Sequence, residues 1–216
     1  MYRMSDKLRI LITNDDGYYS DGINAVFKEL SRFAEVYLVA PDREQSASSH
    51  SLTLNRPLRM HKIDKHHYTT DGTPTDCVML ALHVVFNNKK PDFIVSGINH
   101  GANMGDDVTY SGTIAAAIEG AILNIPSIAA SMANYEPGTP MTRAAKYIAK
   151  IIKQHDKLNW LHRASSISMS RVTTALRTSD LSSLARGCGS TRMSSSRRQI
   201  PEGCRITGSA DGPNGE

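Results

Sequence analysis

Short apolar runs alternate with helix-patterned segments over most of the chain, and this order restricts the fold more than any other feature. The apolar runs lie at residues 7–12, 35–40, 92–96 and 126–130. Segments with helical periodicity lie at residues 23–33, 74–86, 113–123 and 141–154. Short apolar strands that alternate with helices form a mostly parallel sheet covered on both faces. The sequence therefore predicts an α/β fold of this kind. Two extended segments, residues 51–60 and 67–70, predict a β-hairpin excursion from the sheet.

The composition changes after Trp160. Residues 161–216 contain no aromatic residue and no lysine, but 8 arginines and 12 serines. Such a segment buries too little apolar surface to offset the entropy lost on ordering. We therefore divide the chain into an α/β domain, residues 1–160, and an atypical Arg/Ser-rich tail, residues 161–216, which is expected to be largely disordered or out of frame.

Charge and cysteine content restrict the class of protein. The net charge is +4, but residues 1–160 carry 17 basic and 17 acidic side chains, so the tail holds the whole excess. A nucleic-acid-binding protein with an Arg-rich tail is one alternative, and the neutral domain argues against it. No apolar run approaches the ~20 residues of a membrane span, and no secretory signal pattern is present. The odd number of cysteines, three, favours a reducing, cytoplasmic location.

Polar clusters follow the predicted strands at residues 13–17, 42–50 and 96–113. In open α/β sheets, ligands bind beyond the carboxyl ends of the strands. We therefore expect the three clusters to converge on one site.

Oxygen donors dominate these clusters. Asp15 and Asp16 are adjacent carboxylates, whose repulsion a hard cation would relieve; the alternative is a turn with two solvated acids. The second cluster adds the Ser46 hydroxyl, and the third adds the amides of Asn99 and Asn103, which can face a cation or an anion. Oxygen donors favour Mg²⁺, Mn²⁺ or Ca²⁺ over zinc.

An anion site is predicted at the start of the helix near residue 113. Ser111, Gly112 and Thr113 present two hydroxyls and backbone N–H groups at a helix N-terminus, where phosphates bind. The lysine of a Walker loop is absent, and no GxGxxG follows the first strand, which argues against P-loop NTPases and NAD-dependent enzymes. Metal-ligating oxygens opposite an anion site favour metal-assisted phosphoryl transfer to water.

The longest motifs resemble the SurE (survival protein E) family. They are ILITNDDG at 10–17, VAPDREQSASSHSLT at 39–53, TDGTPTDCV at 70–78, IVSGINHGANMG at 94–105, YSGTIAAAIEGA at 110–121 and IPSIAAS at 125–131. The resemblance is nearly colinear over residues 7–160. It implies a Rossmann-like fold and a divalent-metal-dependent 5′-nucleotidase that hydrolyses nucleoside 5′-monophosphates to nucleoside and phosphate. It also implies acid-phosphatase character, with some activity on short polyphosphate.

Carried over by position, the resemblance implies one divalent cation per subunit, Mg²⁺ or Mn²⁺. Its ligands would be Asp15, Asp16, Ser46 and Asn99. Phosphate would meet Asn103, Ser111, Gly112 and Thr113. Either aspartate could take the proton of the attacking water, and the sequence does not choose between them. Family members assemble as homodimers or tetramers through a C-terminal extension. Many of them have His at the position of Tyr110.

Family members continue with a segment like LPPGxxxNVNVP, whereas this chain reads LHRASSISMSR at 161–171. Read from the third base of each codon, beginning in the codon of Leu161, the stretch Leu-His-Arg-Ala can encode Pro-Pro-Gly. We therefore interpret the tail as a frameshift near residues 160–161. The family's oligomer contacts follow this point, so the alternative function is a nucleotide-binding protein with impaired catalysis.

Overall fold

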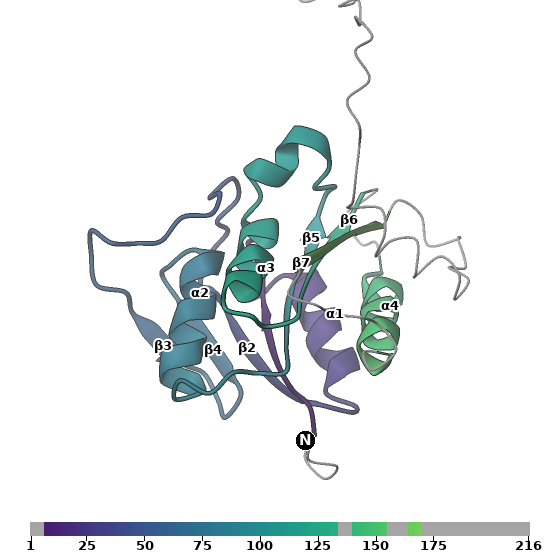
Figure 1. Cartoon of the computed structure of the whole chain (residues 1–216), viewed down its shortest axis with the longest axis horizontal. Coiled ribbons are helices and arrows are strands. Elements are labelled where there is room, and N and C mark those ends of the chain that lie inside the picture. The colour runs from purple at the N-terminus through teal and green to yellow at the C-terminus, as the bar shows by residue number, and fades with distance from the viewer. Residues whose placement is uncertain (1–6, 134–139, 155–163, 170–216) are drawn as a thin grey trace, which may run out of the picture.

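A computed structural model describes residues 7–133, 140–154 and 164–169 of the chain. These residues form a sheet with the strand order β3-β4-β2-β1-β5-β6-β7 (Figure 1). The strands are β1 (Arg9–Thr13), β2 (Glu35–Pro41), β3 (Met60–Lys62), β4 (His67–Thr70), β5 (Phe93–His100), β6 (Ser127–Met132) and β7 (Ala164–Met169). β3 pairs antiparallel with β4, and every other pairing is parallel. The mostly parallel sheet and the hairpin excursion are confirmed.

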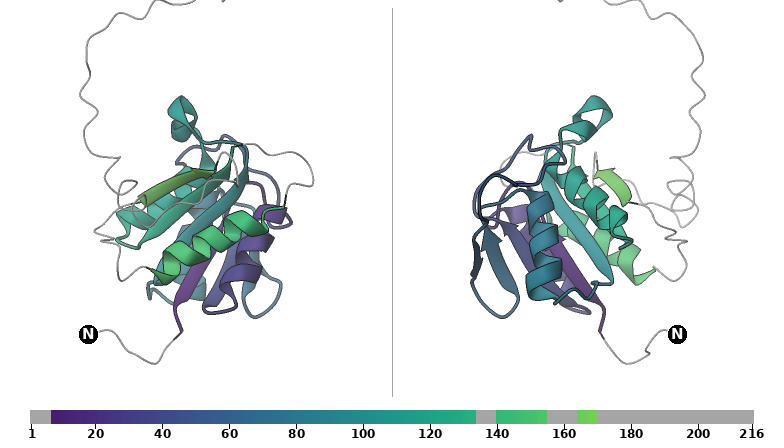
Figure 2. Two further views of the ribbon diagram at one scale, coloured as in Figure 1. Left: turned by 90° about the vertical axis from the view of Figure 1, so that its right-hand side faces the viewer. Right: turned by 60° about the vertical axis from the view of Figure 1, so that its left-hand side comes forward.

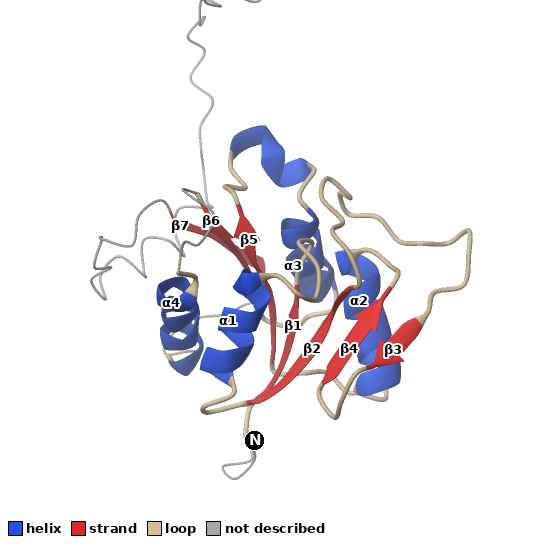
Figure 3. Ribbon diagram, turned by 180° about the vertical axis from the view of Figure 1, so that it is seen from behind, coloured by secondary structure: helices blue, strands red, loops and turns tan. Residues whose placement is uncertain are grey.

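Helices cover both faces of the sheet (Figures 2 and 3). α1 (Asp21–Leu30) and α4 (Thr142–Lys153) pack together on one face, and α2 (Pro74–Leu80) and α3 (Gly112–Ile122) pack together on the other. α2 continues into the π-helical turn η1 (Ala81–Val85), and the 3₁₀ turn η2 (Gly105–Thr109) precedes α3. No helix in the described part of the chain combines the length and the apolar character needed to cross a bilayer.

The alternating side chains of β1 divide the core between the two faces. Ile10 and Ile12 pack toward α1 and α4, whereas Leu11 packs toward α2 and α3. Side chains alternate across a strand, so a continuous apolar run is the pattern expected of a strand buried on both faces. Cys77 of α2 is fully buried in the second layer, as expected of a core residue.

Local signals set the start of α2. The Thr73 hydroxyl accepts the backbone N–H of Asp76, and the Asp76 carboxylate accepts the backbone N–H of Thr73. Pro74 follows the cap, where its missing N–H costs nothing. This reciprocal cap stabilises the helix that the sequence predicts at residue 74.

Several element boundaries differ from the sequence prediction, and three of the differences change how segments are assigned. Only Met60 of residues 51–60 belongs to a strand; the preceding residues instead bond to α2, for example through Thr53 and Asp76. β5 extends through His100, four residues into the predicted loop. β7 lies within the segment assigned to the tail and pairs with β6, so the sheet continues past residue 160. The rest of that segment, residues 170–216, lies outside the described residues.

Candidate functional site

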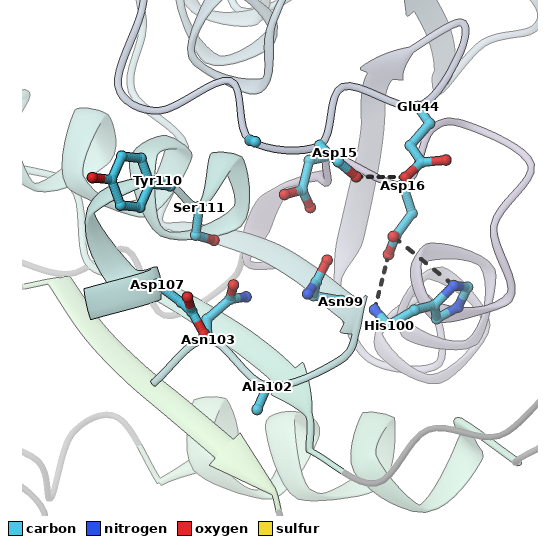
Figure 4. A pocket seen from close by; sticks show the side chains of 12 residues that line it. Asp15, Asp16, Glu44, Asn99, His100, Ala102, Asn103, Asp107, Tyr110 and Ser111 are labelled. Carbon is cyan, nitrogen blue, oxygen red and sulfur yellow. Dashed lines mark hydrogen bonds and ion pairs between the residues drawn. The ribbon is translucent and has the colours of Figure 1, made fainter. Parts of the chain in front are cut away.

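The three polar clusters line one cleft of about 390 Å³ beyond the carboxyl ends of the parallel strands (Figure 4). Its walls are formed by Asp15, Asp16, Glu44, Ser46, Ala47, Asn99, His100, Ala102, Asn103, Asp107, Tyr110 and Ser111. All four side chains predicted as metal ligands therefore reach the same cavity, together with two of the four residues predicted to bind phosphate.

Asp15 is held by the first turn of α3. It follows β1 directly and is only 5% exposed. Thr113 donates its backbone N–H to one carboxylate oxygen at 3.1 Å and its hydroxyl to the other. Burial raises the pKa of Asp15 above its usual value, and the hydrogen bonds from Thr113 act in the opposite direction. The helix N-terminus therefore stabilises a protein carboxylate.

The structure gives Thr113 and Gly112 other neighbours than the phosphate that the resemblance implies. The N–H and the hydroxyl of Thr113 bond to Asp15 instead of facing a phosphate, and neither residue lines the cleft. A Cβ atom at Gly112 would lie 3.0 Å from the Cβ of Asp15 and 2.7 Å from the Ser48 hydroxyl. Glycine at this position therefore permits two loops to pack against the start of α3.

Asp16 contacts the end of β5 and is less buried than Asp15. Its carboxylate accepts the backbone N–H of His100 at 3.2 Å, and the His100 Nδ1 lies 3.9 Å from its other oxygen. Burial raises the pKa of Asp16 to about 6; His100 opposes this effect, and the charge of Asp15 adds to it.

A shift in strand register brings Asn99 into the cleft. The pairing of β5 with β6 is regular up to Ser96 and resumes at Asn99. Gly97 lies between them with φ +113°, and a Cβ there would lie 2.3 Å from the carbonyl oxygen of Ala130. The Asn99 amide nitrogen donates to the carbonyl of Gly101 at 3.1 Å. Its amide oxygen consequently points toward the two aspartates (Figure 4).

The remaining predicted residues have partners that orient them. Ser46 donates its hydroxyl to the carboxylate of Glu44. Asn103 donates one amide hydrogen to the Ser131 hydroxyl of β6 at 2.7 Å, which leaves its second hydrogen available. The Ser111 hydroxyl caps α3 by accepting the N–H of Ile114, and its own hydrogen is available for a ligand.

Sequence reasoning missed Glu44, His100 and Asp107. Each lies inside a cluster that the sequence did single out, but none has a spacing that distinguishes it from a solvated surface residue. His100 follows Asn99 directly, and its hydrogen bond to Asp16 comes from the backbone N–H, which any residue type except proline would provide.

The cleft is strongly acidic. Among the described residues that line it are four carboxylates, from Asp15, Asp16, Glu44 and Asp107, and no Lys or Arg. In the described part of the chain, no three His, Cys, Asp or Glu side chains group closely enough to hold a metal by themselves. A cation here would need neutral oxygens as well, and Asn99 and Ser46 present them.

Comparisons with known proteins agree with this architecture. The model of the family described as Survival protein SurE matches residues 10–193. The crystal structure of a SurE protein from Aquifex aeolicus superposes with a TM-score of 0.70 at 45% identity, covering 76% of this chain and 67% of that one.

Curated relatives named 5′-nucleotidase SurE share about half of the aligned residues. The protein from Aliivibrio fischeri is 50% identical over 149 residues, which is 69% of this chain and 57% of the relative. The protein from Geotalea daltonii is 49% identical over 144 residues, which is 67% of this chain and 58% of the relative. The chain thus spans less than two thirds of the length of these relatives.

Proposed function

Because the chain belongs to the SurE family, we propose that it is a divalent-metal-dependent 5′-nucleotidase. The reaction is hydrolysis of a nucleoside 5′-monophosphate to nucleoside and inorganic phosphate, with short polyphosphate as a further expected substrate. One observation carries the proposal: the carboxylates of Asp15 and Asp16 and the amide oxygen of Asn99 face one acidic cleft, whose lining has no Lys or Arg within the part of the chain that the structure describes.

The donor set fits a hard cation. Carboxylate, amide and hydroxyl oxygens suit Mg²⁺ or Mn²⁺ better than softer metals. Asp15, Asp16, Asn99 and Ser46 would hold it. When bound, such a cation supplies Lewis-acid activation of water and neutralises charge on the phosphoryl group. Without it, the four carboxylates of the lining would repel a phosphate dianion, so the acidity of the cleft itself supports a metal.

The two aspartates have different roles in this proposal. Both carboxylate oxygens of Asp15 accept hydrogen bonds from Thr113, which fix the orientation of the carboxylate. Asp15 is therefore assigned as a metal ligand and not as the base. Within the described residues, the Asp16 carboxylate accepts one hydrogen bond, from the backbone N–H of His100. With more of its lone pairs available, Asp16 is the residue that accepts the proton of the attacking water.

Substrate phosphate would be oriented by hydrogen-bond donors on the side of the cleft away from Asp16. Asn103 and Ser111 each retain a hydrogen that their own partners do not use. Both residues line the cleft on that side (Figure 4). This revises the predicted phosphate site from the turn that includes Thr113 to these two side chains.

The test is phosphate release from a panel of nucleoside monophosphates by the chain as given, with Mn²⁺, with Mg²⁺ and with EDTA. The proposal predicts turnover with a divalent cation and its loss with EDTA. Nucleotide binding without turnover would instead support the impaired nucleotide-binding protein. Turnover that EDTA leaves unchanged would contradict the proposed role of the four oxygen donors.

A further inference from the structure

One contact of the loop that carries Ser46 has no part in the proposed reaction. Nε2 of His50 lies 2.8 Å from Oε2 of Glu119 in α3. Glu119 is 7% exposed, whereas the His50 side chain is 37% exposed. Neither residue lines the cleft. A buried carboxylate is costly without a partner, and His50 provides one.

The loop itself, residues 43–51, has a conformation that needs support from outside. Ala47 and Ser49 have φ values of 56° and 52°, in the left-handed region. Residues other than glycine persist there only when the surrounding structure holds them. Because Ser46 and Ala47 line the cleft, any relaxation of the loop moves a wall of the site.

The loop is held along α3 at successive points. The N–H of Ser49 donates to the carbonyl of Tyr110 at 3.0 Å, just before the helix. Ser48 packs against the first turn, since its hydroxyl lies 2.7 Å from where a Cβ of Gly112 would be. The contact between His50 and Glu119 lies about two turns further along α3.

We infer that the His50–Glu119 pair fixes the 43–51 loop on α3 and thereby holds Ser46 at the cation site; the inference rests on the proposed function. The same helix holds Asp15 through Thr113. α3 is therefore the common support for two ligands that come from different loops. His50 and Glu119 act as positioning residues, because they reach the site only through the loop.

The test compares His50→Ala, Glu119→Ala, the double variant and Glu119→Gln in the full chain. Mn²⁺ affinity is measured by calorimetry without nucleotide, and hydrogen exchange is measured in the peptide spanning residues 43–51. Both alanine variants are expected to bind Mn²⁺ roughly tenfold more weakly, the scale seen when residues that orient metal ligands are removed. Exchange in the loop peptide should be faster. Glu119→Gln keeps an oxygen that accepts a hydrogen bond from His50 and should stay near the parent.

The two residues act as a unit in this inference. The double variant should therefore bind Mn²⁺ with the same affinity as the single variant that binds it less tightly. The matched control is Asp64→Ala, which breaks another His–carboxylate pair, with His67, at the β3–β4 turn away from the cleft. It should leave Mn²⁺ affinity within about twofold of the parent, as expected for a surface pair outside the site.

Parent-like Mn²⁺ affinity and loop exchange in His50→Ala would overturn the inference. Because His50 is partly exposed, this variant is the one expected to fold like the parent. Its melting temperature is measured to check this. Phosphate release is measured separately. A parent chain that binds Mn²⁺ but releases no phosphate would contradict the proposed function, while a loss of affinity in His50→Ala would still support the positioning role.

Discussion

Asp15 combines burial, charge and a helix terminus at one residue. Its carboxylate is 5% exposed, and both oxygens accept hydrogen bonds from the first turn of α3. Backbone N–H groups at a helix N-terminus carry partial positive charge, so they favour the ionised form that a cation needs. In the role of metal ligand that we propose for it, a buried carboxylate in fixed geometry would need little reorganisation on binding a cation.

Asp15→Asn is expected to abolish activity without unfolding the chain. The amide oxygen can still accept from Thr113, but the negative charge is lost. We expect kcat/KM to fall by about 100-fold or more, the scale of removing one preorganised charge-stabilising group. Phosphate release and thermal unfolding are measured on the same preparation. Near-full turnover in this variant would contradict the assignment, and Asp64→Asn serves as the exposed control.

The role of Thr113 can be separated from phosphate binding. Thr113→Val removes the hydroxyl that donates to Asp15 and leaves a buried carboxylate with one hydrogen bond fewer. We expect Mn²⁺ affinity without nucleotide to fall roughly tenfold, and Thr113→Ser to restore it. If Thr113 contacted phosphate instead, Mn²⁺ affinity would be unchanged and only KM for the nucleotide would rise.

At the scale of elements, the C-terminal end of β5 positions residues of the cleft. The register shift between Ser96 and Asn99 turns a strand into a cleft wall without ending its pairing with β6. Such irregularities occur next to functional sites because they redirect side chains. α1 packs closely on this segment: a Cβ on Gly22 would lie 2.0 Å from the carbonyl oxygen of Ile98.

Gly22→Ala therefore tests the contact between α1 and β5. The added methyl has to displace backbone, and overpacking of this kind costs about 1–3 kcal/mol. Urea unfolding should show this loss, and Mn²⁺ affinity should fall because Asn99 follows Ile98 directly. Lys28→Ala on the exposed side of the same helix is the control, with an expected change within about 0.5 kcal/mol. Equal stability of the two variants would show that α1 does not constrain β5.

At the scale of the whole molecule, the chain combines a domain of the SurE family with an atypical C-terminal segment. The family model matches through residue 193, and the curated relatives extend well beyond the length that this chain covers. β7 lies at residues 164–169, inside the segment that we assigned to the tail. The division of the chain near residue 160 stays a prediction.

The frameshift interpretation predicts that the gene, read in the alternate frame after Trp160, encodes an ending like that of the family. Nucleotide sequencing checks it directly, and an alternate frame without such an ending would contradict it. With that frame restored, the chain should form the homodimer or tetramer that we propose from the family. Light scattering on both forms measures the difference, and equal masses would show that the replaced segment does not govern assembly.

How much of the fold and the candidate site could be predicted depends on how far apart in the sequence the interacting residues lie. The apolar periodicity, the Thr73–Asp76 cap and the polar clusters are local features. The sequence by itself therefore determined the alternation of strands and helices along the chain and the kinds of oxygen donor that the clusters present. Even Asp15, Asp16, Asn99 and Ser46 followed from residue chemistry and family resemblance, and the structure brings them to one cleft.

Only the tertiary structure decided which partner each group has. Asp15 and Thr113 are 98 residues apart in the chain, and His50 and Glu119 are 69 apart. A helix N-terminus binds whichever anion the fold brings to it, so the sequence could identify that site but not its occupant. The pKa of Asp16, raised to about 6, likewise depends on burial that arises when distant segments pack around the carboxylate.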